Sequence, residues 1–133
     1  MKIARQAYMG LAYLFVLGVV IQVFLAGIGI FGESGDDLNP HDSFGLTVMQ
    51  LIPILLLVAA LVGRMRWTFA GLSAVLILLV GLQSVWTSED NSRWIKAIHP
   101  TMAIVMFALG HFLAQRAGHL VKGEATLGAE PVG

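Results

Sequence analysis

Two histidines stand at the beginnings of two apolar segments, each beside a proline. His41 opens the segment 40–63, and His99 opens the segment 99–115. A neutral imidazole is a common metal ligand in proteins, and axial ligation by histidine is one way of holding haem iron. The sequence therefore indicates His41 and His99 as candidate axial ligands of a haem.

The residues one helical turn away from these histidines are small. Gly45 follows His41, and Ala103 follows His99, each at a spacing of four. Residues four apart lie on the same face of a helix, so neither side chain fills the space beside its imidazole. This spacing is compatible with a flat macrocycle between the two segments.

Two amide side chains lie inside the other two apolar segments. Gln22 belongs to the segment 7–31, and Gln83 belongs to the segment 67–86. A polar side chain within a membrane segment is costly and requires a partner or a function. We expect both amides near the bound ligand, although hydrogen bonds between helices also explain such residues.

Two basic residues precede His99 near the predicted aqueous edge. Arg93 and Lys96 lie in the connection before the segment 99–115. The carboxylates of a haem form strong hydrogen bonds with cationic donors. We therefore expect Arg93 and Lys96 to bind the haem propionates.

The histidines also allow simpler interpretations. An imidazole at a helix end can bond to water or to a loop carbonyl, Asp42 can partner His41, and one histidine alone can reach into a pocket. His111 lies roughly 120° around the helix from His99 and has no histidine opposite it. His119 lies among basic residues, where it is expected to meet lipid headgroups.

The elements that carry these residues are expected to be membrane helices. Hydrophobic residues make up 57% of the 133 and charged residues only 12%, whereas a soluble domain carries about 25% charged residues. Four continuous apolar runs are each close to the roughly 20 residues that cross a hydrocarbon core: 7–31, 40–63, 67–86 and 99–115. The predicted fold class is all-α, an integral membrane four-helix bundle.

Short connections predict an up-down-up-down order of the four helices. The second and fourth helices then run in the same direction, so His41 and His99 lie at similar depth. With neighbouring axes about 8–10 Å apart, the diagonal of such a bundle is roughly 11–14 Å. That gap suits a macrocycle with one imidazole on each side.

The basic residues predict which end of the bundle faces the cytoplasm. Six of the eight lie at one end: Lys2, Arg5, Arg64, Arg66, Arg116 and Lys122. We expect both termini in the cytoplasm, with residues 1–117 forming the bundle and residues 118–133 a disordered tail. The zero net charge gives no footprint for nucleic acid, and the absence of cysteine excludes thiolate metal sites.

The layout resembles a family of small, uncharacterised four-helix bacterial membrane proteins, known only as a domain of unknown function. The resemblance extends to about residue 117. It depends on the run 20–27, on His41 with Gly45, on Leu82-Gln83, and on Ile98-His99-Pro100.

More distantly, the chain is similar to one half of haem A synthase and to other four-helix b-type cytochromes. In those proteins the second and fourth helices supply the axial histidines, which implies His41 and His99 as the ligands here. The glutamate expected in the first helix of haem A synthase has no equivalent, and Gln22 is the nearest polar residue. The resemblance therefore implies haem binding without implying chemical modification of the haem.

These features predict a mono-haem, bis-histidine b-type cytochrome of the bacterial inner membrane. It would transfer electrons within a larger assembly of membrane subunits, and would not be an enzyme on its own. The alternative is an accessory or scaffold subunit that has no cofactor or that binds chlorophyll. A channel or transporter is disfavoured because the membrane interior is expected to contain few polar residues and no charges.

Overall fold

The computed structural model describes residues 1–32 and 38–127, which form helices joined by short turns. The helix α1 (Lys2–Phe31) is followed by α2 (Asn39–Phe44), the π-helical segment η2 (Gly45–Met49) and α3 (Gln50–Val62). The second half of the chain contains α4 (Trp67–Gly81), α5 (Gln83–Trp86), α6 (Arg93–Lys96) and α7 (Ile98–Leu127). No strand occurs among the described residues.

These elements combine into four helices that are long and apolar enough to cross a membrane, which we name spans 1 to 4. They are Lys2–Phe31, Asn39–Val62, Trp67–Trp86 and Arg93–Gly123. Each contains almost all of one predicted segment. The prediction of an all-helical chain with four such helices is therefore confirmed.

The end of α7 differs from the prediction. The helix continues to Leu127, past the predicted end at residue 115 and into residues 118–133, for which the sequence predicts disorder. Residues with good helix propensity, such as Ala117, Leu120 and Lys122, allow the helix to continue. The last part of the predicted tail, residues 128–133, lies outside the described residues.

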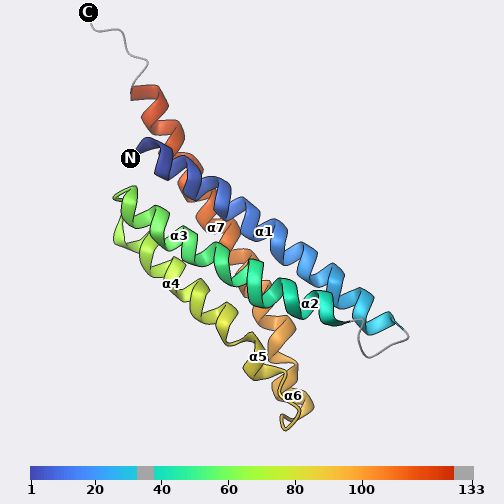
Figure 1. Cartoon of the computed structure of the whole chain (residues 1–133). Coiled ribbons are helices and arrows are strands. Elements are labelled where there is room, and N and C mark those ends of the chain that lie inside the picture. The colour runs from blue at the N-terminus through green and yellow to red at the C-terminus, as the bar shows by residue number, and fades with distance from the viewer. Residues whose placement is uncertain (33–37, 128–133) are drawn as a thin grey trace, which may run out of the picture.

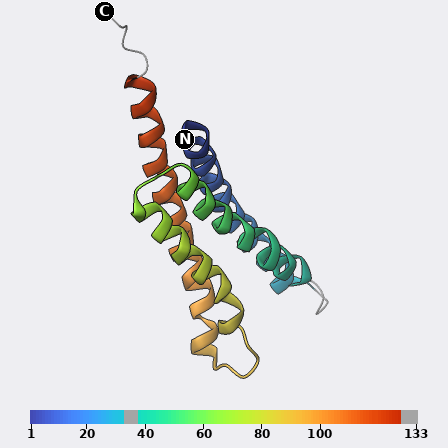
Figure 2. The same ribbon diagram turned by 60° about the vertical axis from the view of Figure 1, so that its left-hand side comes forward.

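The four spans pack around a common core and separate into two pairs toward one end (Figure 1). Span 1 packs against span 2 and span 4, while span 3 packs against span 2 and less extensively against span 4. Spans 2 and 4 are therefore diagonal neighbours. Figures 1 and 2 show the pair formed by spans 1 and 2 diverging from the pair formed by spans 3 and 4, toward the end that carries α2 and α6.

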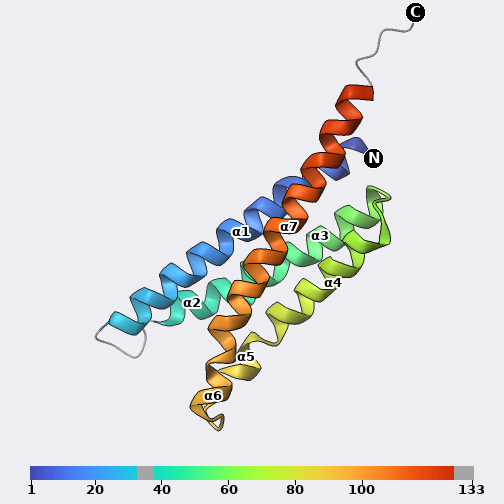
Figure 3. The ribbon, with the colours of Figure 1, turned by 180° about the vertical axis from the view of Figure 1, so that it is seen from behind.

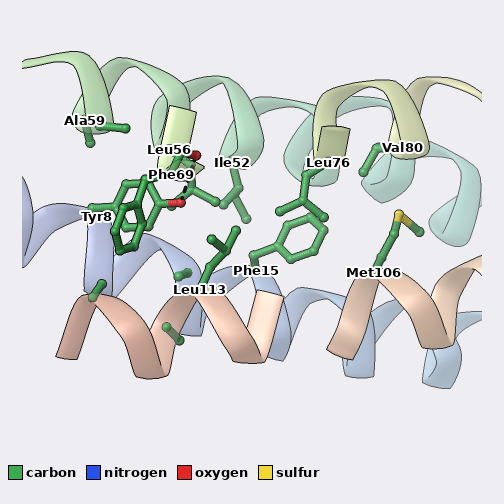
Figure 4. Close-up of a cluster of buried hydrophobic side chains, with 14 of the residues drawn as sticks. Tyr8, Phe15, Ile52, Leu56, Ala59, Phe69, Leu76, Val80, Met106 and Leu113 are labelled. Carbon is green, nitrogen blue, oxygen red and sulfur yellow. Dashed lines mark hydrogen bonds between the residues drawn. The ribbon is translucent and has the colours of Figure 1, made fainter. Parts of the chain in front are cut away.

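The apolar core occupies only one half of the bundle. Buried apolar side chains lie within residues 8–19, 49–60, 69–80 and 106–117, which is twelve positions, or about 18 Å, on each span. Figure 4 shows this core, in which Phe15 lies beside Leu76 and Leu113, and Leu56 lies beside Tyr8 and Phe69. We call residues 1–19, 49–81 and 106–127 the packed half, and residues 20–32, 38–48 and 82–105 the histidine half.

The packed half also contains hydrogen bonds between spans. The Tyr8 hydroxyl lies 3.0 Å from the Ser73 hydroxyl, and Ser73 donates to the Phe69 carbonyl at 2.8 Å. The Tyr8 ring meets the Phe69 ring edge to face, with centroids 5.4 Å apart. Nearer the terminus, Arg5 donates from Nε to the Gly63 carbonyl at 3.0 Å, where the end of α3 leaves carbonyl groups without helical partners.

The turn that ends α3 contains a strained residue. Arg64 has φ of 47°, in the left-handed region that side chains with a Cβ rarely adopt. The backbone N–H of Met65 donates to the Ala60 carbonyl at 2.9 Å, and the N–H of Arg64 donates to the Leu61 carbonyl at 3.1 Å. These two bonds form a Schellman motif, in which the left-handed position usually carries glycine.

Span 2 is interrupted by the π-helical segment η2, just before Pro53. Proline has no N–H and its ring crowds the carbonyl four residues earlier, which disturbs the helix there. The Thr47 hydroxyl donates to the Ser43 carbonyl at 2.5 Å, a contact that also bends helices. A π-helical turn inserts about one extra residue, so it turns His41 by roughly 100° relative to the core face of α3.

Candidate functional site

His41 of α2 and His99 at the start of α7 meet between the diagonal spans. Their ring centroids are 5.9 Å apart, with 60° between the ring planes. Both side chains are partly buried. The two histidines predicted to face each other thus lie close together. Figure 3 shows the fold from behind, with α2 and the start of α7 near the same end.

The Nδ1 atom of each imidazole lies against a backbone carbonyl of the neighbouring span. The distance is 3.0 Å from His41 to the Gln22 carbonyl and 3.2 Å from His99 to the Gln83 carbonyl. Because a carbonyl oxygen only accepts, each Nδ1 carries the hydrogen and donates it. In the neutral ring this leaves the lone pair of each Nε2 free to bind a metal.

The same arrangement therefore occurs twice. In spans 1 and 2, Gln22 holds His41, and in spans 3 and 4, Gln83 holds His99. Metal-binding histidines almost always donate their second ring N–H to a carbonyl or carboxylate, which fixes the ring orientation and raises the basicity of the ligand. Both halves of the chain thus present an imidazole in the form that a metal requires.

The ring separation fits both a direct edge-to-face contact of the two rings and one shared metal. A metal–imidazole bond is about 2 Å long, and roughly 1 Å more separates each nitrogen from its ring centre, so two rings on one metal have centroids about 6 Å apart. The observed separation is 5.9 Å. Within residues 1–32 and 38–127, no three His, Cys, Asp or Glu side chains gather as a metal site. A metal here would need its other ligands from a macrocycle or from solvent.

The amide side chains of the two glutamines lie beside this pair with unused acceptors. Oε1 of Gln22 and Oε1 of Gln83 are buried and have no hydrogen-bond partner. The Gln83 amide donates weakly to the Met106 sulfur at 3.9 Å. A buried acceptor without a partner costs free energy, so both oxygens are available to a donor group of a ligand or to a water molecule.

Gly45 provides space for the Gln22 amide. A Cβ at position 45 would lie only 2.7 Å from Gln22 Nε2. Ala103, the corresponding residue of α7, is partly buried and packs against the edge of the core. The space beside Gly45, which the spacing predicts for a macrocycle, is thus occupied by an amide of span 1.

The two predicted propionate partners lie at the same end of the bundle but bond within their own loop. The Arg93 guanidinium lies 5.2 Å from the centre of the Trp94 ring. Lys96 donates to the Glu89 carbonyl at 3.4 Å. Both side chains are exposed, so rotation about their side-chain bonds is needed for either to reach a ligand between the histidines.

The other two histidines lie away from this pair. His111 is exposed on α7, stacks on Phe107 at 6.5 Å between ring centroids, and lies 2.9 Å from the Gln115 amide nitrogen. His119 is exposed near the end of the same helix. The structure thus brings together His41, His99, Gln22 and Gln83, and separates His111 and His119 from them.

The functional atoms that sequence reasoning missed are the backbone carbonyls of Gln22 and Gln83. Their side chains marked the correct helical turns, because a polar residue is conspicuous in an apolar segment. The signal that points to the carbonyls is geometric. In each pair of connected spans, the glutamine precedes the connection and the histidine follows it, so the two residues meet when the pair folds back on itself.

Comparison with known proteins gives one match. The model of a family of unknown function (DUF6220) matches residues 22–89, just over half of the 133 residues. This range includes Gln22, His41 and Gln83 and ends before His99. No curated protein and no solved structure matches the chain, so the resemblance to haem A synthase stays a prediction.

Proposed function

The chain belongs to the DUF6220 family, and we propose that it is a b-type cytochrome subunit of the membrane. In this proposal one haem binds between spans 2 and 4, with His41 and His99 as its axial ligands. When bound, the haem iron supplies one-electron transfer. The protein supplies two neutral imidazoles, their orientation and an apolar surrounding.

The observation that carries the proposal is the pairing of two imidazoles with matching hydrogen bonds. The ring centroids are 5.9 Å apart, and each Nδ1 is held by a carbonyl, so each Nε2 is available. The hydrogen bonds to Gln22 and Gln83 keep both rings in one tautomer and make them better donors to iron.

The position at which the apolar core ends also supports a haem site between spans 2 and 4. The last buried apolar residues before the site are Val19, Met49, Val80 and Met106, one on each span. Beyond them the two pairs of spans diverge (Figure 2). The histidine half therefore lacks a packed apolar core between its spans, and the proposed macrocycle would lie there.

We further propose the membrane arrangement that the sequence predicts. The four spans would cross the bacterial inner membrane in up-down-up-down order, with both termini in the cytoplasm. The contact of Arg5 with Gly63 brings the basic residues of α1 and of the turn at Arg64 to one end, as the positive-inside rule expects of a cytoplasmic face. With so little mass outside the bilayer, the subunit would exchange electrons within a larger redox assembly.

The test is a visible spectrum, reduced minus oxidised, of the protein purified from its native membrane, with pyridine extraction to identify the pigment. The expected result is a low-spin b-type signal at about one haem per chain, lost in His41→Ala and in His99→Ala. His111→Ala is the matched control, because it removes a histidine of α7 away from the site, and should keep the signal.

Two other outcomes would replace the proposal. A magnesium-containing macrocycle in the extract would identify a chlorophyll-binding subunit. A folded but colourless preparation would identify a cofactor-free accessory subunit, provided that His41→Ala and His99→Ala also assemble normally. In that case the histidines would serve only to form hydrogen bonds between spans.

A further inference from the structure

One face of α7 differs from the rest of the exterior. Its exposed residues recur at alternating spacings of three and four, directly opposite the buried face that contains Met106, Leu113 and Ala117. We call this row the α7 seam; it comprises Thr101, Ile104, Ala108, His111 and Gln115. Alternating spacings of three and four are the pattern by which one helix packs along another.

The composition of the α7 seam is unusual for a surface in contact with lipid. The exposed residues of the other spans are mostly large and aliphatic, including Leu14, Leu17 and Val20 on α1, Leu51, Leu55 and Val58 on α3, and Val75 and Leu78 on α4. The α7 seam instead contains small and polar residues, with Ile104 as its one large aliphatic side chain. Small and polar residues are enriched where membrane helices contact one another.

The polar pair of the α7 seam lies deep within the spans. Gly110 approaches Phe15, and Gly118 lies near Met9, so His111 and Gln115 are level with the apolar stretch of α1 between Met9 and Phe15. Their mutual bond of 2.9 Å uses one Gln115 N–H and the His111 Nε2 lone pair. The remaining groups of both side chains have no partner among the described residues, and hydrocarbon offers none.

We propose that the α7 seam binds a second copy of this chain. None of its five residues is charged, so two copies do not repel, and no acidic or basic partner is called for. A carboxamide both donates and accepts, which makes Gln115 complementary to itself. Two copies share one orientation in a membrane, so a two-fold axis along the membrane normal sets the two α7 helices parallel, with each seam residue beside its equivalent.

The nearest cation is held away from the α7 seam. The Arg116 guanidinium lies 5.1 Å from the centre of the Phe112 ring, and both residues lie to one side of the row. The two-fold contact therefore buries the His111–Gln115 pairs of both copies without burying Arg116. The proposal requires that the spans lie in a membrane, and it does not depend on haem.

The first test uses the absence of cysteine from the chain. Ala108→Cys places a thiol on the α7 seam, and Leu78→Cys places one on the exposed face of α4 as the matched control. After oxidation in liposomes at low protein density, disulfide-linked dimers are expected for Ala108→Cys and not for Leu78→Cys. Equal cross-linking of the two variants, or none in either, would overturn the proposal.

The second test measures association of labelled protein in liposomes by energy transfer. The double variant His111→Leu with Gln115→Leu should reduce the association constant roughly tenfold, since hydrogen bonds between membrane helices are individually modest. Leu51→Ala with Leu55→Ala has the same spacing on α3 and should leave association unchanged. A monomeric wild-type protein would mean that a different subunit covers the α7 seam, and would also overturn the proposal.

Discussion

The packed half and the histidine half are built from the same four helices but are held together differently. In the packed half, every span contributes buried apolar side chains, and Tyr8, Ser73 and Arg5 add hydrogen bonds between spans. In the histidine half, apolar side chains such as Val23, Phe24 and Leu46 face outward, and the contacts between spans involve imidazole rings and carbonyls. The comparison separates the part that stabilises the fold from the part that is available to a ligand.

The largest expected effect tests which half carries stability. Leu113→Ala removes a side chain that is 1% exposed and should lower the free energy of unfolding by about 2–5 kcal/mol, because it leaves a cavity. Leu46→Ala removes a leucine of the histidine half that is 71% exposed and should change it by about 0.5 kcal/mol or less. Unfolding in mixed detergent micelles measures both. Equal losses would show that the two halves contribute alike to stability.

An intermediate effect is expected for a substitution in the histidine half, next to the residue that holds His41. Gly45→Val places atoms against the Gln22 amide, which displaces the side chain of the residue that holds His41. Haem affinity should fall roughly tenfold, as for other groups that orient metal ligands. The free energy of unfolding should change by about 1 kcal/mol or less, because the amide is the mobile end of a side chain.

The matched control for this variant lies on α1. A Cβ at position 27 has no atom within 4 Å, so Gly27→Val should retain both stability and haem affinity. Titration of the purified protein with haem, followed at the absorbance of the bound form, gives the affinities. If the Gly45→Val protein binds haem as tightly as the Gly27→Val protein does, the position of the Gln22 amide does not affect haem affinity.

The smallest expected effect lies at the turn of the packed half. Arg64→Gly should raise the free energy of unfolding by about 0.5–1 kcal/mol, because glycine adopts positive φ without steric cost. Arg66→Gly removes a charge from the same turn at a residue with φ of −57° and should not stabilise. The midpoint of unfolding in detergent micelles measures both variants. If the two shift it alike, the strain at Arg64 has no measurable effect on the free energy of unfolding.

Much of the architecture was predictable from the sequence because apolar runs and their interruptions are local features. The turn at Arg64 and Arg66 and the loop before His99 divide the chain where helices end. The first three helical segments followed closely, whereas the fourth extends well past its predicted end at residue 115. The pairing of His41 with His99 also followed, because equal positions on diagonal helices imply equal depth.

The confinement of the core to one half of the bundle was not predictable from hydropathy. Residues 20–31 of span 1 are as apolar as residues 8–19, yet only the latter contain buried side chains. Lipid and protein interiors both favour apolar residues, so composition alone does not tell a core face from a lipid-facing one. The carbonyl partners of the histidines were missed for a related reason, since they depend on how each span is rotated, and the π-helical segment alters that rotation in span 2.

The confinement of the core to one half has a consequence for how the subunit matures. A chain whose packing is complete in the packed half can fold without a ligand between the histidines. If the proposed haem binds, it would enter at a late step of biogenesis, between two pairs of spans that are already joined at their far ends. In this order the packed half would form first, and the histidine half would receive its ligand afterwards.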